Sequence, residues 1–212
     1  MKIKHALIFA TAILFASCSG NIKKVIVYAN HDADINQDTK TITQKDDEGH
    51  IDKELDYTSG GKVELRVQQK DGTSTTLEML DAGYYIVNAK VKDTIIGGFQ
   101  NYSTPEEANR VITQDELKHD IDSLLQMIEG KNINKANRTF FIPPNTVAKI
   151  TSNSDATIVG PYHRMTSVEK QGDKEPEVYR FYSINEVRET IGKLQKLTGE
   201  NPKEADSTKK AK

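Results

Sequence analysis

The chain has 212 residues, one cysteine, and 29 basic against 31 acidic side chains, for a formal net charge of -2. One cysteine excludes an internal disulfide and a multi-cysteine zinc site, and the balanced charge gives no global field to attract nucleic acid, so no nucleic-acid partner is expected. Hydrophobic residues make up 36% and charged residues 28% of the chain, which excludes a multi-span membrane protein and a wholly disordered chain.

The first 17 residues have the pattern of a secretory signal. Met1–His5 is short and basic, and residues 6–16 (ALIFATAILFA) form an uncharged apolar run. The run is about half of the ~20 residues that a helix needs to cross a bilayer. The small residues Ala16 and Ser17 follow, as at a cleavage site, and Cys18 comes directly after them. The alternatives are an ordinary signal peptide with a cysteine nearby by chance and a short buried helix.

Residues 14–18 (LFASC) resemble the lipobox of bacterial lipoproteins. The family pattern has Leu three positions before the cysteine, where this chain has Phe15, with Leu14 one place earlier. The resemblance implies that Cys18 receives a diacylglyceryl group on its sulfur and that a signal peptidase cuts between Ser17 and Cys18. Because each buried CH₂ contributes ~0.8 kcal/mol, two or three acyl chains hold a protein stably, so the membrane is an expected partner through Cys18.

The residues after the cysteine bear on sorting. Ser19 stands where enteric lipoproteins retained in the inner membrane have Asp. The site is also similar to that of Bacteroidota lipoproteins, in which an acidic cluster directly after the cysteine marks export to the cell surface. The nearest acidic cluster here, residues 45–48, lies too far downstream. These resemblances imply an outer-membrane lipoprotein that faces the periplasm, with surface exposure left open.

Composition divides the chain into six parts. They are a signal peptide (1–17), a lipidated cysteine with a short tether (18–21), a β-rich region (22–100), a helical region (101–132), a region of strands with a C-terminal helix (133–199) and a disordered tail (200–212). Whether 133–199 forms one domain with 22–132 is left open.

Alternating or β-branched apolar runs predict strands. They lie at residues 22–29, 63–67, 75–80, 83–91, 138–142, 146–151, 156–162 and 178–182. Residues 30–57 are polar, and we expect either a weak hairpin around residues 46–49 or a loop there. Residues 80–85 (LDAGYY) look like the turn into a core strand of small β-sandwich modules.

Three capping-box patterns predict three helices, which begin after Thr104, Thr113 and Ser183. The second ends at Gly130 and the third at Gly199, and both carry an apolar face. Together with the strands, these helices predict an α+β fold rich in antiparallel strands, with a sandwich-like N-terminal part, about three helices and a cleaved signal peptide in front.

One acidic segment begins like a calcium loop, because oxygen ligands stand at alternate positions. These ligands are Asp32, Asp34, Asn36 and Asp38. Gln37 stands where such a loop needs Gly, and Thr43 where it needs a bidentate Glu. We therefore expect a solvated acidic loop, with no metal and no cofactor.

The mature chain keeps four histidines, and no two of them stand at metal-ligand spacing. They are His31, His50, His119 and His163. We expect His119 to face solvent from its helix. His163, beside Tyr162 and Arg164, either lines a groove or lies in a turn after a strand, and we expect the turn.

The sequence lacks the motifs of nucleophilic and nucleotide-binding enzymes, such as G-x-S-x-G and the P-loop. A hydrolase with paired carboxylates leaves no local trace. We therefore predict a membrane-anchored envelope lipoprotein that is a non-enzymatic binding or assembly module of unknown ligand, with an envelope protein as a candidate partner. The alternative is a lipid-anchored hydrolase acting on glycan or peptidoglycan.

Three triplets are similar to the O-glycosylation signal of Bacteroidota periplasmic proteins. Their acceptor residues are Thr94, Ser123 and Ser207. Ser123 lies in an expected helix, which disfavours it, whereas Ser207 lies in the tail and is the most accessible of the three.

Overall fold

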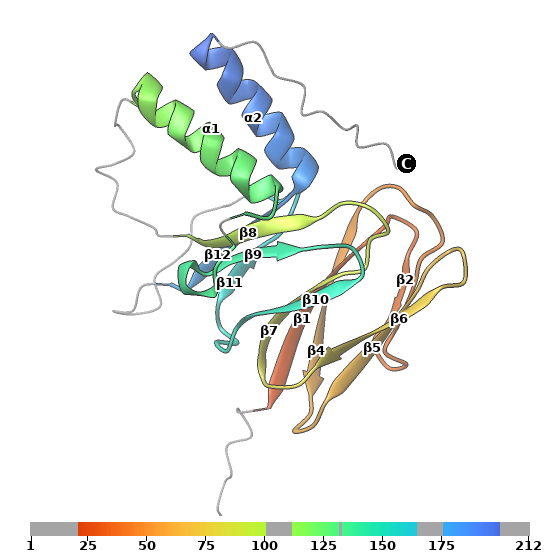
Figure 1. The fold of residues 1–212 in the computed structure, drawn as a ribbon. Helices are drawn as coiled ribbons and strands as arrows, with labels where there is room; N and C mark the ends of the chain where they lie inside the picture. Colours follow the sequence, from red (N-terminus) through yellow and green to blue (C-terminus); the bar gives the residue numbers. More distant parts are fainter. Residues whose placement is uncertain (1–20, 101–111, 132, 165–175, 200–212) are drawn as a thin grey trace, which may run out of the picture.

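The computed structural model of the chain describes residues 21–100, 112–131, 133–164 and 176–199. Within these ranges, twelve strands form three four-stranded sheets, and two α-helices lie at one end of the body (Figure 1). The chain therefore has an α+β fold with a β-rich part, as its sequence predicts.

The first sheet has the order β10-β7-β1-β4. Its strands are β10 (Thr146–Thr151), β7 (Gly83–Asn88), β1 (Ile22–Ala29) and β4 (Ile51–Thr58). β1 pairs with β4 in antiparallel register and with β7 in parallel register. The first strand after the N-terminal region is thus an inner strand of its sheet.

The other two sheets lie on either side of the first. One has the order β2-β3-β5-β6, and its strands are β2 (Asp34–Asn36), β3 (Thr41–Thr43), β5 (Val63–Gln68) and β6 (Ser74–Met79). The other has the order β11-β12-β8-β9, and its strands are β11 (Thr157–Val159), β12 (Val178–Ser183), β8 (Ile95–Gln100) and β9 (Thr139–Ile142).

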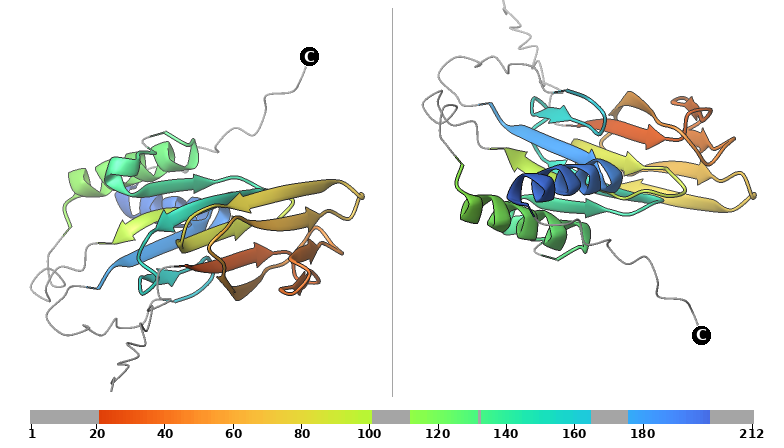
Figure 2. Two further views of the ribbon diagram at one scale, coloured as in Figure 1. Left: turned by 90° about the horizontal axis from the view of Figure 1, so that it is seen from below. Right: turned by 90° about the horizontal axis from the view of Figure 1, so that it is seen from above.

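Both faces of β1 are apolar, and each face packs in a different core. Val25 and Val27 pack in a core shared with the second sheet, whereas Ile26 and Tyr28 pack in a core shared with the third sheet. Since successive residues of a strand point to opposite faces, a continuous apolar run suits a strand between two layers. The result is three stacked sheets with the helices as a fourth layer (Figure 1), and seen from above the helices lie over the strands (Figure 2).

The helices α1 (Gln114–Ile128) and α2 (Ile184–Thr198) cover the outer face of the third sheet. Both begin with the predicted capping box, at Thr113 and Ser183. Ile121 of α1 and Val187 of α2 pack against Ile96 of β8. A single 3₁₀ turn (Lys135–Asn137) precedes β9. The helix expected after Thr104 lies outside the described residues.

Of the two alternatives expected around residues 46–49, the hairpin is wrong, and residues 44–50 form a loop between β3 and β4. β3 pairs with β2 and β5, whereas β4 pairs along its full length with β1. The physical reason is burial: Ile42 of β3 and Leu55 of β4 both reach the core between the first two sheets, each from its own sheet. The turn between these strands therefore connects two layers.

Three strand pairs are parallel, which the sequence patterns do not predict. They are β1–β7, β3–β5 and β11–β12. Each partner follows after intervening chain, so no local turn signal marks the pairing. Neither described helix is long and apolar enough to cross a membrane.

Candidate functional site

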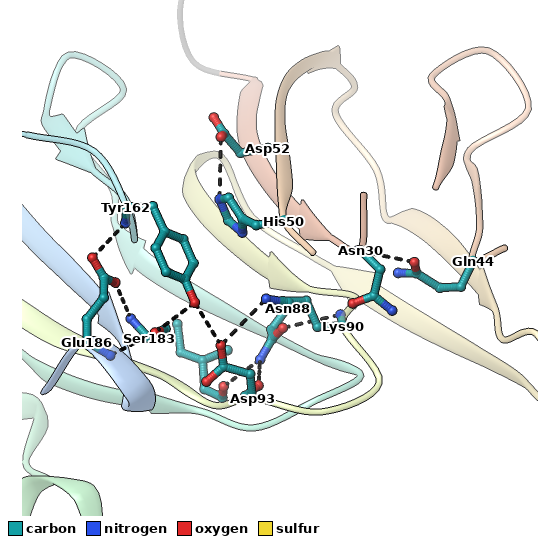
Figure 3. A network of polar contacts seen from close by, with 11 residues as sticks. Asn30, Gln44, His50, Asp52, Asn88, Lys90, Asp93, Tyr162, Ser183 and Glu186 are labelled. Carbon is teal, nitrogen blue, oxygen red and sulfur yellow. Dashed lines mark hydrogen bonds and ion pairs between the residues drawn. The ribbon is translucent and has the colours of Figure 1, made fainter. Parts of the chain in front are cut away.

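Ionisable and aromatic side chains gather near the C-terminal end of β1 (Figure 3). His50 directly precedes β4, and Asp52 lies opposite Tyr28 in the β1–β4 register. Because His50 and Asp52 are two residues apart on extended backbone, their side chains share one side of the strand. His163 reaches the same place from the turn after β11.

The two imidazoles share one carboxylate oxygen. His163 Nε2 lies 2.9 Å from Asp52 Oδ1, and His50 Nε2 lies 3.6 Å from the same oxygen. The three residues each offer one atom that can bind a metal, and these atoms lie within 4.8 Å of one another. The side chain of His50 is 18% exposed and that of His163 is 53% exposed, so the group runs from the interior to the solvent.

The ring of His50 contacts two tyrosine rings. Its ring stacks on Tyr28 with centroids 5.7 Å apart and lies 4.6 Å from the ring of Tyr162. Both of its ring nitrogens are buried and have no hydrogen-bond partner. Burial, and then the positive charge of Lys90, lower the pKa of His50, so the neutral imidazole, which can accept a proton or a cation, is favoured.

A buried ion pair adjoins the histidines. Lys90 Nζ lies 3.5 Å from Asp93 Oδ2, and both side chains are 9% exposed. The hydroxyl of Tyr162 lies 3.0 Å from Ser183 Oγ and 3.4 Å from Asp93 Oδ2. The backbone N–H of Tyr162 donates to Glu186 Oε1 at 2.8 Å. The capping box of α2 therefore fixes the turn that carries the second histidine.

Tyr28 is the buried neighbour of His50 on the interior side of the His50–Asp52–His163 group. Burial, and then the charge of Asp52, raise the pKa of its hydroxyl. A Cβ at Gly160 would lie 2.0 Å from Tyr28 Oη, so this close approach requires glycine. The carbonyl of Gly160 accepts a hydrogen bond from Arg180 Nη1 at 3.1 Å. Tyr28 is thus held by the third sheet as well as by its own.

Buried amides join the chain segments around the group (Figure 3). Gln44 accepts from the backbone N–H of Asn30 at 3.2 Å and donates to the carbonyl of Ala89 at 2.7 Å. Asn88 donates to the carbonyls of Ile142 and Asp93, at 2.9 and 3.0 Å. These bonds satisfy backbone groups just after β1 and β7 of the first sheet, at the end of β9 and before β8 of the third sheet.

A separate apolar pocket of about 320 Å³ lies between the third sheet and the helices. Its lining includes Gly98, Phe99, Leu124, Met127, Tyr182 and Val187. Arg180 also lines the pocket, and its guanidinium lies 4.7 Å above the ring of Tyr182. Among the described residues of this lining there is no carboxylate and no histidine.

No family model matches this chain. No curated protein and no solved structure is significantly similar to it. Its function is therefore inferred from its own residues and their geometry.

The four calcium-ligand candidates do not lie in one loop. Asp34 and Asn36 belong to strand β2, and Asn36 Oδ1 accepts a hydrogen bond from the backbone N–H of Thr39. Asp32 lies 2.9 Å from His31 Nδ1. Of the three acidic candidates, Asp32 alone belongs, within the described ranges, to a group of three side chains whose spacing could hold a metal ion, and the other two members are His31 and Asp46.

Two of the three glycosylation candidates are described. Thr94 is half-buried before β8, and its carbonyl accepts a hydrogen bond from the backbone N–H of Ile184. Ser123 is exposed on α1. The residues of the lipidation and cleavage site, Ser17 and Cys18, and the third acceptor, Ser207, lie outside the described residues.

The outcome for the histidines is mixed. His119 is exposed on α1, and His163 lies in a turn after β11, and both findings confirm the predictions. Local metal-ligand spacing does not reveal the group of His50 and His163, because the two lie 113 positions apart in the sequence. The pattern His50-Ile51-Asp52 was the one available signal, since a strand places its first and third residues on one side.

Proposed function

We propose that the chain is an envelope lipoprotein, held to the outer membrane by lipid on Cys18, and that its folded body is a non-enzymatic binding or assembly module on the periplasmic side. One observation carries the proposal: the lipobox-like Cys18 stands only four positions before Ile22, where β1 begins. Since β1 is an inner strand that contributes to two cores, the anchor leads directly into the body.

The position of β1 also sets the orientation of the body. β1 begins at the end of the body opposite the helices (Figure 1). Tyr28 stands six residues beyond Ile22, and at a rise of ~3.3 Å per residue this is about 20 Å along the strand. An anchor at Cys18 therefore places the membrane at one end and leaves the histidine group and the helices farther from the lipid.

The apolar pocket supports a binding role for this distal end. Its volume of about 320 Å³ lies in the range of ligand sites, which are mostly apolar with a few polar groups that set orientation. Arg180 and Tyr182 supply such groups here. An aromatic and aliphatic lining without a described carboxylate or histidine favours binding over hydrolysis in this pocket.

Metabolic labelling with palmitate tests the anchor. The wild-type protein is expected to incorporate label and to fractionate with outer-membrane markers, whereas Cys18→Ala loses both properties. Ser17→Ala is the matched control, because it keeps a small residue before the cysteine and is expected to remain labelled. Labelling of Cys18→Ala, or an unlabelled wild type, would contradict the proposal.

A further inference from the structure

We propose that His50, Asp52 and His163 form a binding site for a divalent transition-metal cation of the zinc class, at the junction of the first and third sheets. This inference goes beyond the anchored binding module and does not depend on it. The site combines two imidazoles with one carboxylate, which are ligands that zinc takes in proteins, often with a fourth position left to water.

The distances fit a shared cation. Zinc bonds of 2.0–2.1 Å in tetrahedral geometry place ligand atoms ~3.3 Å apart. The separations from Asp52 Oδ1 are 2.9 Å to His163 Nε2 and 3.6 Å to His50 Nε2, and all three atoms lie within 4.8 Å of one another. Both separations from Asp52 Oδ1 are therefore within a few tenths of an ångström of the spacing that a shared zinc ion requires.

The state of His50 is the second observation. Both of its ring nitrogens are buried without a hydrogen-bond partner, although such groups normally have one. A cation at Nε2 would satisfy one of them. The ion pair of Asp52 with His163 alone leaves His50 unsatisfied, and a half-exposed pair of this kind contributes little to stability.

The surroundings hold the ligands in place. The rings of Tyr28 and Tyr162 both contact the ring of His50, and the backbone of Asp52 is fixed by its pairing with Tyr28 in the β-ladder. Lys90 is a nearby cation that would oppose a metal, and its charge is countered by Asp93 at 3.5 Å. His163, which is 53% exposed, leaves an approach from solvent.

Calorimetric titration with Zn²⁺ tests the site in the detergent-solubilised full chain carrying Cys18→Ser, so that the thiol cannot contribute. We expect one equivalent to bind at this site, and His163→Ala to weaken its affinity at least tenfold. His119→Ala, which removes an exposed histidine from α1, is the matched control and should leave the affinity unchanged. Mg²⁺ and Ca²⁺, which prefer oxygen ligands, should not compete.

Imidazole ¹⁵N spectra keep the test decisive if a variant fails to fold. Zn²⁺ should shift the ring resonances of His50 and His163 and leave those of His31 and His119 in place. The proposal is overturned if Zn²⁺ does not bind, if His163→Ala binds it as tightly as the parent chain, or if the shifts fall on His31 or His119.

Discussion

Asp52 Oδ1 and His163 Nε2 lie 2.9 Å apart, although 111 residues separate the two in the sequence. The contact links the start of β4, in the first sheet, to the turn that follows β11, in the third. Tyr162 ties the same turn to the N-terminus of α2. A substitution at the start of this helix should therefore alter the position of the turn that carries His163.

Ser183→Ala should destabilise the protein more than Thr113→Ala. Each residue caps a helix, and losing a cap costs ~0.5–2 kcal/mol. Ser183 is 1% exposed, and its Oγ also lies 3.0 Å from the hydroxyl of Tyr162, whereas Thr113 is exposed. Urea unfolding of the two variants measures the difference, and equal losses would contradict a structural link between the cap and the turn.

Gly97→Ala should destabilise the third sheet. A Cβ at Gly97 would lie 2.1 Å from the carbonyl oxygen of Arg180 and 2.7 Å from the Cα of Phe181, both in the backbone of β12. Such overpacking typically costs ~1–3 kcal/mol. Gly192→Ala on α2 is the control: it meets nothing within 4 Å, and Ala should stabilise the helix by ~0.5–1 kcal/mol. Thermal unfolding should show shifts of opposite sign.

Glu177 should make part of the stability depend on pH. Burial raises its pKa, but hydrogen bonds donated by Tyr179, Asn153 and Thr151, together with the charge of Arg138, outweigh this effect and hold the pKa below its ordinary value near 4.5. Because the pKa of Glu177 is lower in the folded state than in the unfolded state, the ionised carboxylate stabilises the folded state at pH values above the unfolded-state pKa. This contribution is lost as the pH falls through the folded-state pKa.

Glu177→Gln should therefore lower the free energy of unfolding at neutral pH and flatten its fall below pH ~4.5. Unfolding by urea between pH 3 and 7 measures both effects. Glu189→Gln, which alters an exposed position on α2, serves as the control. A pH profile of Glu177→Gln that runs parallel to that of the wild type would rule out this role.

Leu124→Trp should fill the apolar pocket. Leu124 lines the pocket from α1 and is partly buried in the helical core, so a larger ring there occupies space that a ligand would use. Fluorescence of anilinonaphthalene sulfonate, a small apolar probe, should fall relative to the wild type. Leu197→Trp, at a 72% exposed position of α2, should bind the dye normally, and equal binding by both variants would show that the pocket is not the dye site.

The sequence predicts the elements whose burial is regular. β1 and β7 have apolar runs, β5 has clean alternation, and both described α-helices carry their capping boxes. The sequence does not predict β4, because only Leu55 and Tyr57 are buried among its eight mostly polar residues. It does not predict β8 either, because Gly97 and Gly98 interrupt it, where the neighbouring strands approach too closely for a side chain.

The candidate site could be predicted only in part. The pair of His50 and Asp52 was within reach of sequence reasoning, since the two flank one residue of an extended segment. His163 was not, because its place depends on how the third sheet packs on the first. That packing follows from the alternate residues Ile26 and Tyr28 of β1, whose partners come from distant segments.

The mass of the N-terminal tryptic peptide of the mature protein tests the lipid anchor most directly. Cleavage after Lys23 should release a peptide that begins at Cys18 (CSGNIK) and carries the mass of a diacylglyceryl group on the cysteine. An unmodified Cys18, or a mature N-terminus at any other residue, would contradict the account.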